Sequence, residues 1–231
     1  MRQTTLNLVA ISIFALTMAS LLGPLLQVSP VIPAAATVGL LGIVTLDQLS
    51  LGGRLGAIVI DGLDRTSSTY RERILHHEAG HFLIAHLLEI PVVDYTLSPW
   101  ETWRKGLPGL GGVVFDTSAL EEAFAQGQIS AQSLNHFCMV WMAGIAAEQI
   151  VYGAAAGGDD DRQKLRLVCV NLQIAVSQAA MRERWSLLQA KTLIQQHQAA
   201  YSALVQAMAE REPIAVCRQL LREQCQPETA T

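Results

Sequence analysis

The N-terminal part of the chain almost lacks charged residues. Between Arg2 and Asp47, 44 residues pass without an aspartate, glutamate, lysine or arginine. A membrane-spanning helix needs about 20 apolar residues, so this stretch is long enough for two. The pattern predicts a transmembrane helical hairpin over residues 1–50, with a turn at Pro30 and Pro33. A cleaved signal peptide is the alternative, but its apolar core would be only about 7–15 residues long.

The flanks of this apolar stretch carry arginines, whereas the predicted turn carries no charge. Arg2 precedes the stretch, and Arg54 and Arg65 follow it. A hairpin returns both of its ends to one side of the membrane. By the positive-inside rule, we expect the rest of the chain on the cytoplasmic side, or on the equivalent stromal side. The lipid bilayer is therefore an expected partner.

Two further absences exclude classes of function. None of the four cysteines forms a Cys-x-x-Cys pair, so the chain has no disulfide or zinc-ribbon framework to read, and we expect a reducing compartment. No basic run with interleaved aromatic residues occurs, and the net charge is −4. Nucleic acid is therefore not an expected partner.

Beyond the hairpin, the pattern predicts a mainly helical fold with a small β-hairpin. Residues 51–67 are punctuated by glycine and predict a linker, followed by a domain at 68–224 and a disordered tail at 225–231. Two short β-rich runs, 92–98 and 111–117, predict the strands. The helices are expected at about 69–88, 118–126, 130–153, 162–186 and 187–224.

The segment RERILHHEAGHFLIAH, residues 71–86, holds four of the six histidines and contains the pattern His-Glu-x-x-His. Residues four apart share a helix face, so His77 and His81 can direct their imidazoles at one metal ion. Zn²⁺ accepts imidazole nitrogen and, in catalytic sites, keeps one position for water. Glu78 can take the proton of that water as a general base. The pattern also arises by chance, as two hydrogen-bonded histidines on an amphipathic helix.

A zinc site of this kind needs a third protein ligand, and four carboxylates are candidates. Asp159, Asp160 and Asp161 lie in the sequence GGDDD, and Glu148 lies on the predicted helix before it. Carboxylate oxygens are zinc ligands. Three consecutive aspartates also suit a solvated loop or a helix cap, and Glu148 also suits a buried salt bridge. The residues alone leave this choice open.

At two places the sequence resembles a known family. HHEAGHFLIAHLL resembles the HEAGH helix of the FtsH-type zinc peptidase domain. MAGIAAEQIVYGAAAGGDDD resembles that domain's later segment, a GRxAEE…FG helix leading into a TGASND loop. The order also fits, because Asp161 follows His77 by 84 residues. The resemblance covers about 68–224 and implies a zincin-like helical peptidase domain, with Zn²⁺ as cofactor, His77, His81 and Asp161 as zinc ligands, and Glu78 as general base.

The resemblance has departures and further implications. Ile145 stands where the family usually has arginine, and the GGDDD loop is altered. No Gly-x-x-x-x-Gly-Lys-Ser/Thr phosphate loop occurs, so the family's ATPase module is missing from this chain. Substrates would be unfolded proteins or peptides, or proteins presented by a separate ATPase or within a homo-oligomer. The family's matching strand borders the zinc cleft, so we expect an exposed edge at residues 113–115.

The sequence thus predicts a membrane-anchored zinc metalloendopeptidase. One alternative is a catalytically inactive membrane scaffold that regulates an ATP-dependent protease, which the missing ATPase and the altered aspartate loop favour. Another is an intramembrane zinc protease of the site-2 type, which also uses His-Glu-x-x-His. In that class the motif lies within a spanning helix, whereas here three charged residues, Arg71, Glu72 and Arg73, lie within the seven residues before Glu78.

Overall fold

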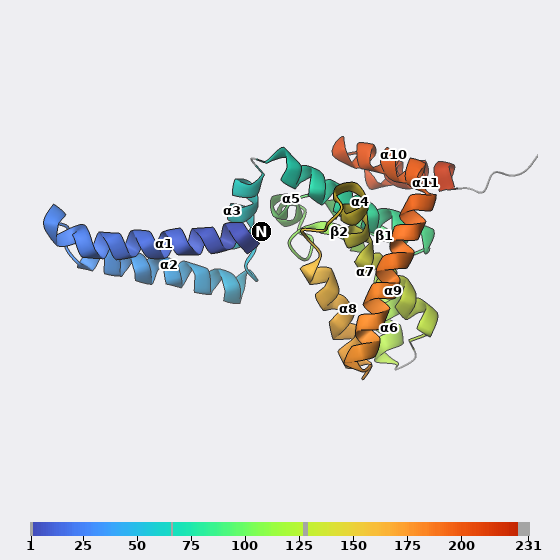
Figure 1. The fold of residues 1–231 in the computed structure, drawn as a ribbon, viewed down its shortest axis with the longest axis horizontal. Helices are drawn as coiled ribbons and strands as arrows, with labels where there is room; N and C mark the ends of the chain where they lie inside the picture. Colours follow the sequence, from blue (N-terminus) through green and yellow to red (C-terminus); the bar gives the residue numbers. More distant parts are fainter. Residues whose placement is uncertain (1, 66, 127–128, 226–231) are drawn as a thin grey trace, which may run out of the picture. The chain divides into compact units, whose positions relative to one another are not determined.

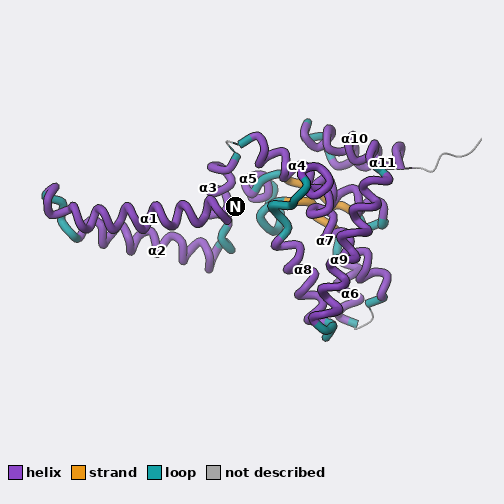
Figure 2. Tube along the Cα trace, in the orientation of Figure 1, coloured by secondary structure: helices purple, strands orange, loops and turns teal. Residues whose placement is uncertain are grey.

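The computed structural model describes residues 2–65, 67–126 and 129–225. This described part is mainly helical and contains one two-stranded antiparallel sheet, shown in orange in Figure 2. The expectation of a mainly helical fold with a small β-hairpin is therefore confirmed. The predicted tail, 225–231, lies outside the described residues except for Cys225, which ends a helix.

The chain forms two compact units. The first comprises Met1–Tyr70 together with Ser98–Gly111, and the second comprises Arg71–Leu97 together with Gly112–Thr231. The segment that connects the two strands thus belongs to the first unit, although both strands belong to the second. Each unit is described by itself below.

The first unit begins with two long apolar helices, which lie side by side in Figure 1. Helix α1 spans Arg2–Leu22 and continues into a short 3-10 helix, and α2 spans Val31–Ser50, with Pro30 at its start. Both are long and apolar enough to cross a membrane. Most of their leucine, isoleucine and valine side chains are exposed, as expected of helices that face lipid. The side of the membrane on which each end lies stays a prediction.

The rest of the first unit consists of two shorter helices. The segment predicted as a linker contains α3, Arg54–Asp64, and the connection between the strands contains α5, Pro99–Arg104. Asp47, buried in the last turn of α2, accepts hydrogen bonds from the backbone N–H groups of Leu55 and Gly56 (3.0 and 2.9 Å). These bonds satisfy donors that the start of α3 would otherwise leave unpaired.

The second unit packs its helices around α4 and α7. Strands β1 and β2 pair antiparallel, with Tyr95 opposite Val113. The predicted helix at 162–186 is interrupted, because the chain turns at Gln173, whose φ is 56°. The predicted boundary between residues 186 and 187 is wrong, because one helix spans Val176–Gln196. The predicted helix at 187–224 is also broken, at His197 and again before α11. The elements are α4 (Ser68–Leu87), β1 (Val92–Thr96), β2 (Gly112–Phe115), α6 (Ser118–Ala125), α7 (Ala131–Tyr152), α8 (Asp159–Asn171), α9 (Val176–Gln196), α10 (Gln198–Ala209) and α11 (Ile214–Cys225).

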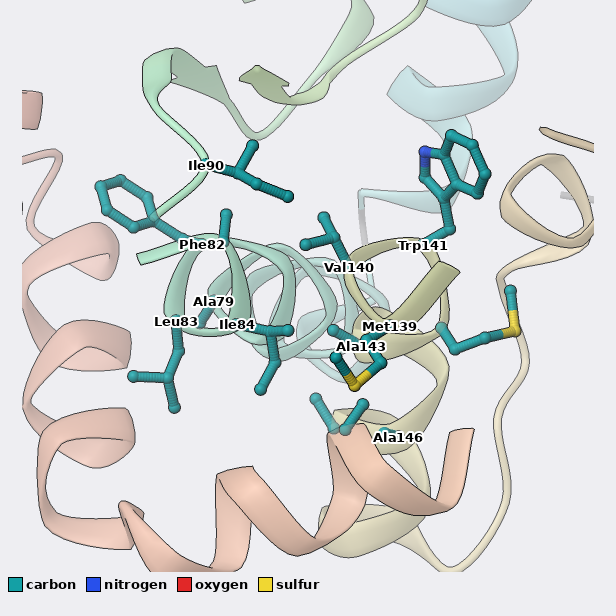
Figure 3. Packing of buried hydrophobic residues seen from close by; sticks show 14 of the residues in the cluster. Ala79, Phe82, Leu83, Ile84, Ile90, Met139, Val140, Trp141, Ala143 and Ala146 are labelled. Carbon is teal, nitrogen blue, oxygen red and sulfur yellow. The ribbon is translucent and has the colours of Figure 1, made fainter. Parts of the chain in front are cut away.

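Helices α4 and α7 are in close contact, and Figure 3 shows the buried apolar side chains between them. Phe82, Leu83 and Ile84 of α4 are fully buried. At Gly80, an added Cβ would lie 2.6 Å from the backbone oxygen of Ala143 on α7, so a larger residue would push the helices apart. A glycine inside a helix costs about 1 kcal/mol relative to alanine, and here the close packing offsets that cost.

Candidate metal centre

Three side chains that are far apart in the sequence meet at one point in the second unit. His77 and His81 lie one turn apart on α4, and Asp161 lies in the first turn of α8. The Oδ2 atom of Asp161 is 3.1 Å from His77 Nε2 and 3.4 Å from His81 Nε2. Their ligand atoms all lie within 4.8 Å of one another, so this group could hold a metal ion.

The two distances from Asp161 to the histidines suit a four-coordinate ion. With bonds of about 2.0–2.1 Å, neighbouring ligand atoms of a tetrahedral site lie about 3.3 Å apart. The separations of 3.1 and 3.4 Å from Asp161 to His77 and His81 bracket this value. The donor set, two imidazole nitrogens and one carboxylate oxygen, suits Zn²⁺ and leaves a fourth position for a small ligand.

The other nitrogen of each imidazole has a fixed acceptor. His77 Nδ1 lies 2.9 Å from Glu148 Oε1, and His81 Nδ1 lies 2.7 Å from the backbone oxygen of Val140. When Nδ1 carries the hydrogen and donates it, Nε2 has its lone pair free for a metal. Both Nε2 atoms are the ones that face Asp161. In that tautomer, both histidines could act as metal ligands.

Glu148 is itself held from several directions. Its carboxylate accepts hydrogen bonds from Arg73 Nη1 (3.1 Å) and from the backbone N–H groups of Ala156 (2.8 Å) and Gly157 (3.3 Å). Burial alone would raise the pKa of Glu148, but the bonds from His77, Ala156 and Arg73 outweigh it and lower that pKa. Of the two roles that the sequence left open for Glu148, the structure gives it that of a buried hydrogen-bond partner.

Glycines make the room that the His77 side chain occupies. At Gly144 on α7, an added Cβ would overlap the imidazole of His77. Gly157 leaves space for the carboxylate of Glu148, because its Cβ would lie 3.0 Å from Oε1. A contribution of Gly144 to the site could not be predicted from the histidine motif, because the residue acts only by being small.

Glu78 lies beside this group and contacts the sheet. Its Oε2 atom accepts a hydrogen bond from the backbone N–H of Val113 on β2 (2.9 Å). Gly112 has a φ of +111°, and an added Cβ there would lie 3.0 Å from the same carboxylate oxygen. The expected exposed edge at 113–115 is half-buried instead, because Glu78 covers Val113 and the ring of Phe115 lies against that of His81.

The ionisation of the site follows from its burial and its charges. Burial alone lowers the pKa of His77, but hydrogen bonds to Asp161 and Glu148 and the nearby charge of Glu78 raise it to about 10. Burial alone raises the pKa of Asp161, but His81, His77 and Lys164 hold it well below its usual range. The buried cluster therefore keeps the carboxylate of Asp161 ionised beside protonated His77. A bound metal cation would supply the positive charge that the protons supply here.

The remaining candidates do not join the group. Asp159 and Asp160 are exposed in the first turn of α8. His76 Nδ1 lies 2.8 Å from the hydroxyl of Tyr201, so it links α4 to α10. His86 lies in the last turn of α4, where burial lowers its pKa. Among the described residues, the group that could hold a metal ion consists of His77, His81 and Asp161, and it includes neither Asp159 nor Asp160.

No protein-family model matches the sequence, and no curated protein matches it. The resemblance to the FtsH-type peptidase domain therefore stays a prediction from two motifs.

Proposed function

We propose that this chain is a membrane-anchored zinc metalloendopeptidase that hydrolyses peptide bonds in unfolded proteins. The observation that carries the proposal is the convergence of His77 Nε2, His81 Nε2 and Asp161 Oδ2, with the carboxylate of Glu78 on the same helix as both histidines. A zinc ion held there would activate a water molecule and polarise the peptide carbonyl.

The chain's own residues have separate tasks in this proposal. His77, His81 and Asp161 hold the ion, and Glu148 fixes the orientation of His77. Glu78 takes the proton of the attacking water and returns it to the leaving amine. The Val113 N–H, which binds Oε2 of Glu78, could donate instead to a backbone carbonyl of an extended substrate.

The likeness of the two motifs to the FtsH-type domain supports the same reaction, and the missing phosphate loop sets its limit. We therefore propose, as the substrate, polypeptide that is already unfolded or that a separate ATPase presents. The two apolar helices support a membrane location for the protein. We place the peptidase unit on the cytoplasmic or stromal side, on the strength of the arginines that flank the hairpin.

The two alternatives have less support. A site-2-type protease needs its motif inside a spanning helix, but α4 is not among the described helices that are apolar enough to span a membrane. An inactive scaffold has no need of the buried ligand-like geometry at His77, His81 and Asp161. It is retained as one outcome of the following test.

The test compares Glu78→Gln with the native chain. We expect the native protein to bind about one zinc per chain and to cleave unfolded casein. Glu78→Gln should keep the zinc but lose cleavage by a factor of about 10²–10⁴, because the amide cannot accept the proton. Glu122→Gln, on the exposed surface of α6, is the matched control and should behave like the native chain.

Zinc content is measured by elemental analysis and cleavage by peptide release, with and without a chelator. Unchanged cleavage by Glu78→Gln would contradict the assignment of the base. A native protein that holds zinc but cleaves neither unfolded casein nor short peptides would support the scaffold instead.

A further inference from the structure

Helix α3 of the first unit has its polar and apolar faces reversed relative to a helix in water. Its exposed residues are Leu55, Gly56, Val59, Gly62 and Leu63, none of which is charged. Val59 is 60 % exposed. In a soluble protein, such a stripe at spacings of four would face the core.

The charges of α3 lie on the protected face. Asp61 is 3 % exposed and accepts hydrogen bonds from Arg65 Nε (2.7 Å) and the hydroxyl of Tyr70 (3.4 Å). Asp64 Oδ1 accepts a hydrogen bond from Thr4 Oγ1 (2.6 Å). The helix thus pairs its acids with groups of its own unit and leaves only apolar side chains outside.

Both ends of α3 are tied to the same end of the apolar hairpin. Its first turn receives the carboxylate of Asp47 from the last turn of α2, and Asp64 near its end binds Thr4 near the start of α1. Only three residues separate α2 from α3, and two of them, Gly52 and Gly53, have positive φ that allows the sharp turn. Helix α3 therefore lies across the end of the hairpin, close to the marker of the N-terminus in Figure 1.

The α5 segment adds an aromatic and cationic border to this face. Helix α5 packs against α3. Trp100 and Trp103 have ring centroids 5.0 Å apart and are 51 % and 48 % exposed. Arg104 and Lys105 follow directly and are exposed as well.

The tip of this segment reaches the end of α2. Leu110 and Gly109 line a hollow together with Ser50, Leu51 and Arg54, where the second apolar helix ends. The tryptophans, the cations and the stripe of α3 are thus parts of one region at one end of the hairpin.

We propose that α3 and the Trp100–Leu110 segment form an interfacial surface that lies on the bilayer beside the hairpin. Leu55, Val59 and Leu63 would enter the boundary between headgroups and acyl chains, as an amphipathic helix does. Trp100 and Trp103 would sit at headgroup level, where tryptophan is enriched. The exposed cations favour anionic headgroups. This inference depends on the membrane anchoring proposed above and not on the peptidase chemistry.

The test uses the tryptophans as depth probes in the full chain, reconstituted in vesicles of phosphatidylcholine and phosphatidylglycerol with brominated acyl chains. The variant Trp141→Phe/Trp185→Phe keeps only Trp100 and Trp103. The control Trp100→Phe/Trp103→Phe/Trp141→Phe keeps only Trp185, which is 41 % exposed on α9 of the second unit.

Brominated lipid should quench most of the fluorescence of Trp100 and Trp103 and leave that of Trp185 unchanged. Acrylamide dissolved in the water should quench Trp185 more strongly than Trp100 and Trp103. Trp100 and Trp103 that respond only to acrylamide would overturn the proposal, as would release of the chain from the membrane by carbonate. A third outcome is that added unfolded casein protects Trp100 and Trp103 from acrylamide while brominated lipid does not quench them. The partner of this surface would then be a polypeptide and not the bilayer.

A second variant tests the contribution of α3. Val59→Asp places a charge on the apolar stripe and should reduce the quenching of Trp100 and Trp103 by brominated lipid. Val176→Asp, at an exposed position on α9, is the matched control and should change nothing. Unchanged quenching in Val59→Asp would remove α3 from the surface. Zinc content, measured in the same samples, reports on the peptidase proposal separately.

Discussion

The two units differ in where they place their large apolar side chains. In the second unit, large apolar residues such as Phe82 and Leu204 are fully buried. In the first, leucines such as Leu41 are largely exposed, while Asp47 and Asp61 are buried. We attribute this difference to the proposed membrane anchoring of the first unit, since lipid takes up apolar surface at no cost but cannot pair a charge. Burial therefore has a different meaning in each unit.

Buried acids should have separable roles in the two units. Asp161→Asn should weaken zinc binding by more than about 100-fold, which is the upper limit for changes to groups behind the ligands. Asp47→Ala should leave zinc affinity unchanged and destabilise the start of α3 by about 1 kcal/mol, as loss of a helix cap does.

Competition with a chromophoric zinc chelator measures the affinities, and Asp159→Asn controls for a simple loss of charge in α8. Equal zinc affinity in Asp161→Asn and Asp159→Asn would break the assignment of the third ligand.

Truncation of a leucine to alanine should lower the free energy of unfolding by different amounts in the two units. Leu204→Ala removes a fully buried side chain of α10 and should lower the free energy of unfolding by about 2–5 kcal/mol. Leu41→Ala, where the native side chain is 61 % exposed on α2, should change it far less, because no cavity forms. Urea unfolding in detergent micelles, followed by circular dichroism, gives both values. A large loss in Leu41→Ala would show that its surface packs against protein instead of lipid.

Alanine substitutions at two glycines test how closely the helices pack in each unit. Gly80→Ala should destabilise the second unit by about 1–3 kcal/mol, because the added methyl meets the backbone of α7. Gly62→Ala on α3 meets no atom within 4 Å and should stabilise that helix by up to about 1 kcal/mol. Thermal unfolding temperatures of the two variants should therefore move in opposite directions, and a fall in both would count against the open face of α3.

The smallest effect on zinc binding is expected for a change to Glu148, which contacts the ligand His77 and not the proposed ion. Glu148→Gln should weaken zinc binding by about 10-fold, the low end for such groups, because the amide oxygen can still accept the His77 N–H. Zinc titration measures the loss, and circular dichroism checks the fold. Affinity equal to that of the native chain would mean that Glu148 does not orient His77.

Much of the architecture follows from local patterns. The uncharged stretch predicted two long apolar helices, and the two short β-rich runs predicted both strands of the sheet. The positions of helix breaks were missed at Gln173 and His197, because nothing in the local periodicity separates a continuous helix from two helices that turn. Helix α3 was missed because its glycines and its short apolar run suggested a linker. The acceptor for its first N–H groups is Asp47 of α2, so the segment carries no capping residue of its own that could have indicated a helix start.

The sequence by itself determined that His77, Glu78 and His81 share one part of a helix, because the spacing of four residues is a property of the helix alone. Only the tertiary structure brought Asp161 to the two Nε2 atoms and gave Glu148 its place behind His77. Three aspartates in a row are equivalent in sequence, but the first turn of α8 buries one and exposes its two neighbours. That choice depends on how α7 and α8 pack against α4, which no local pattern encodes.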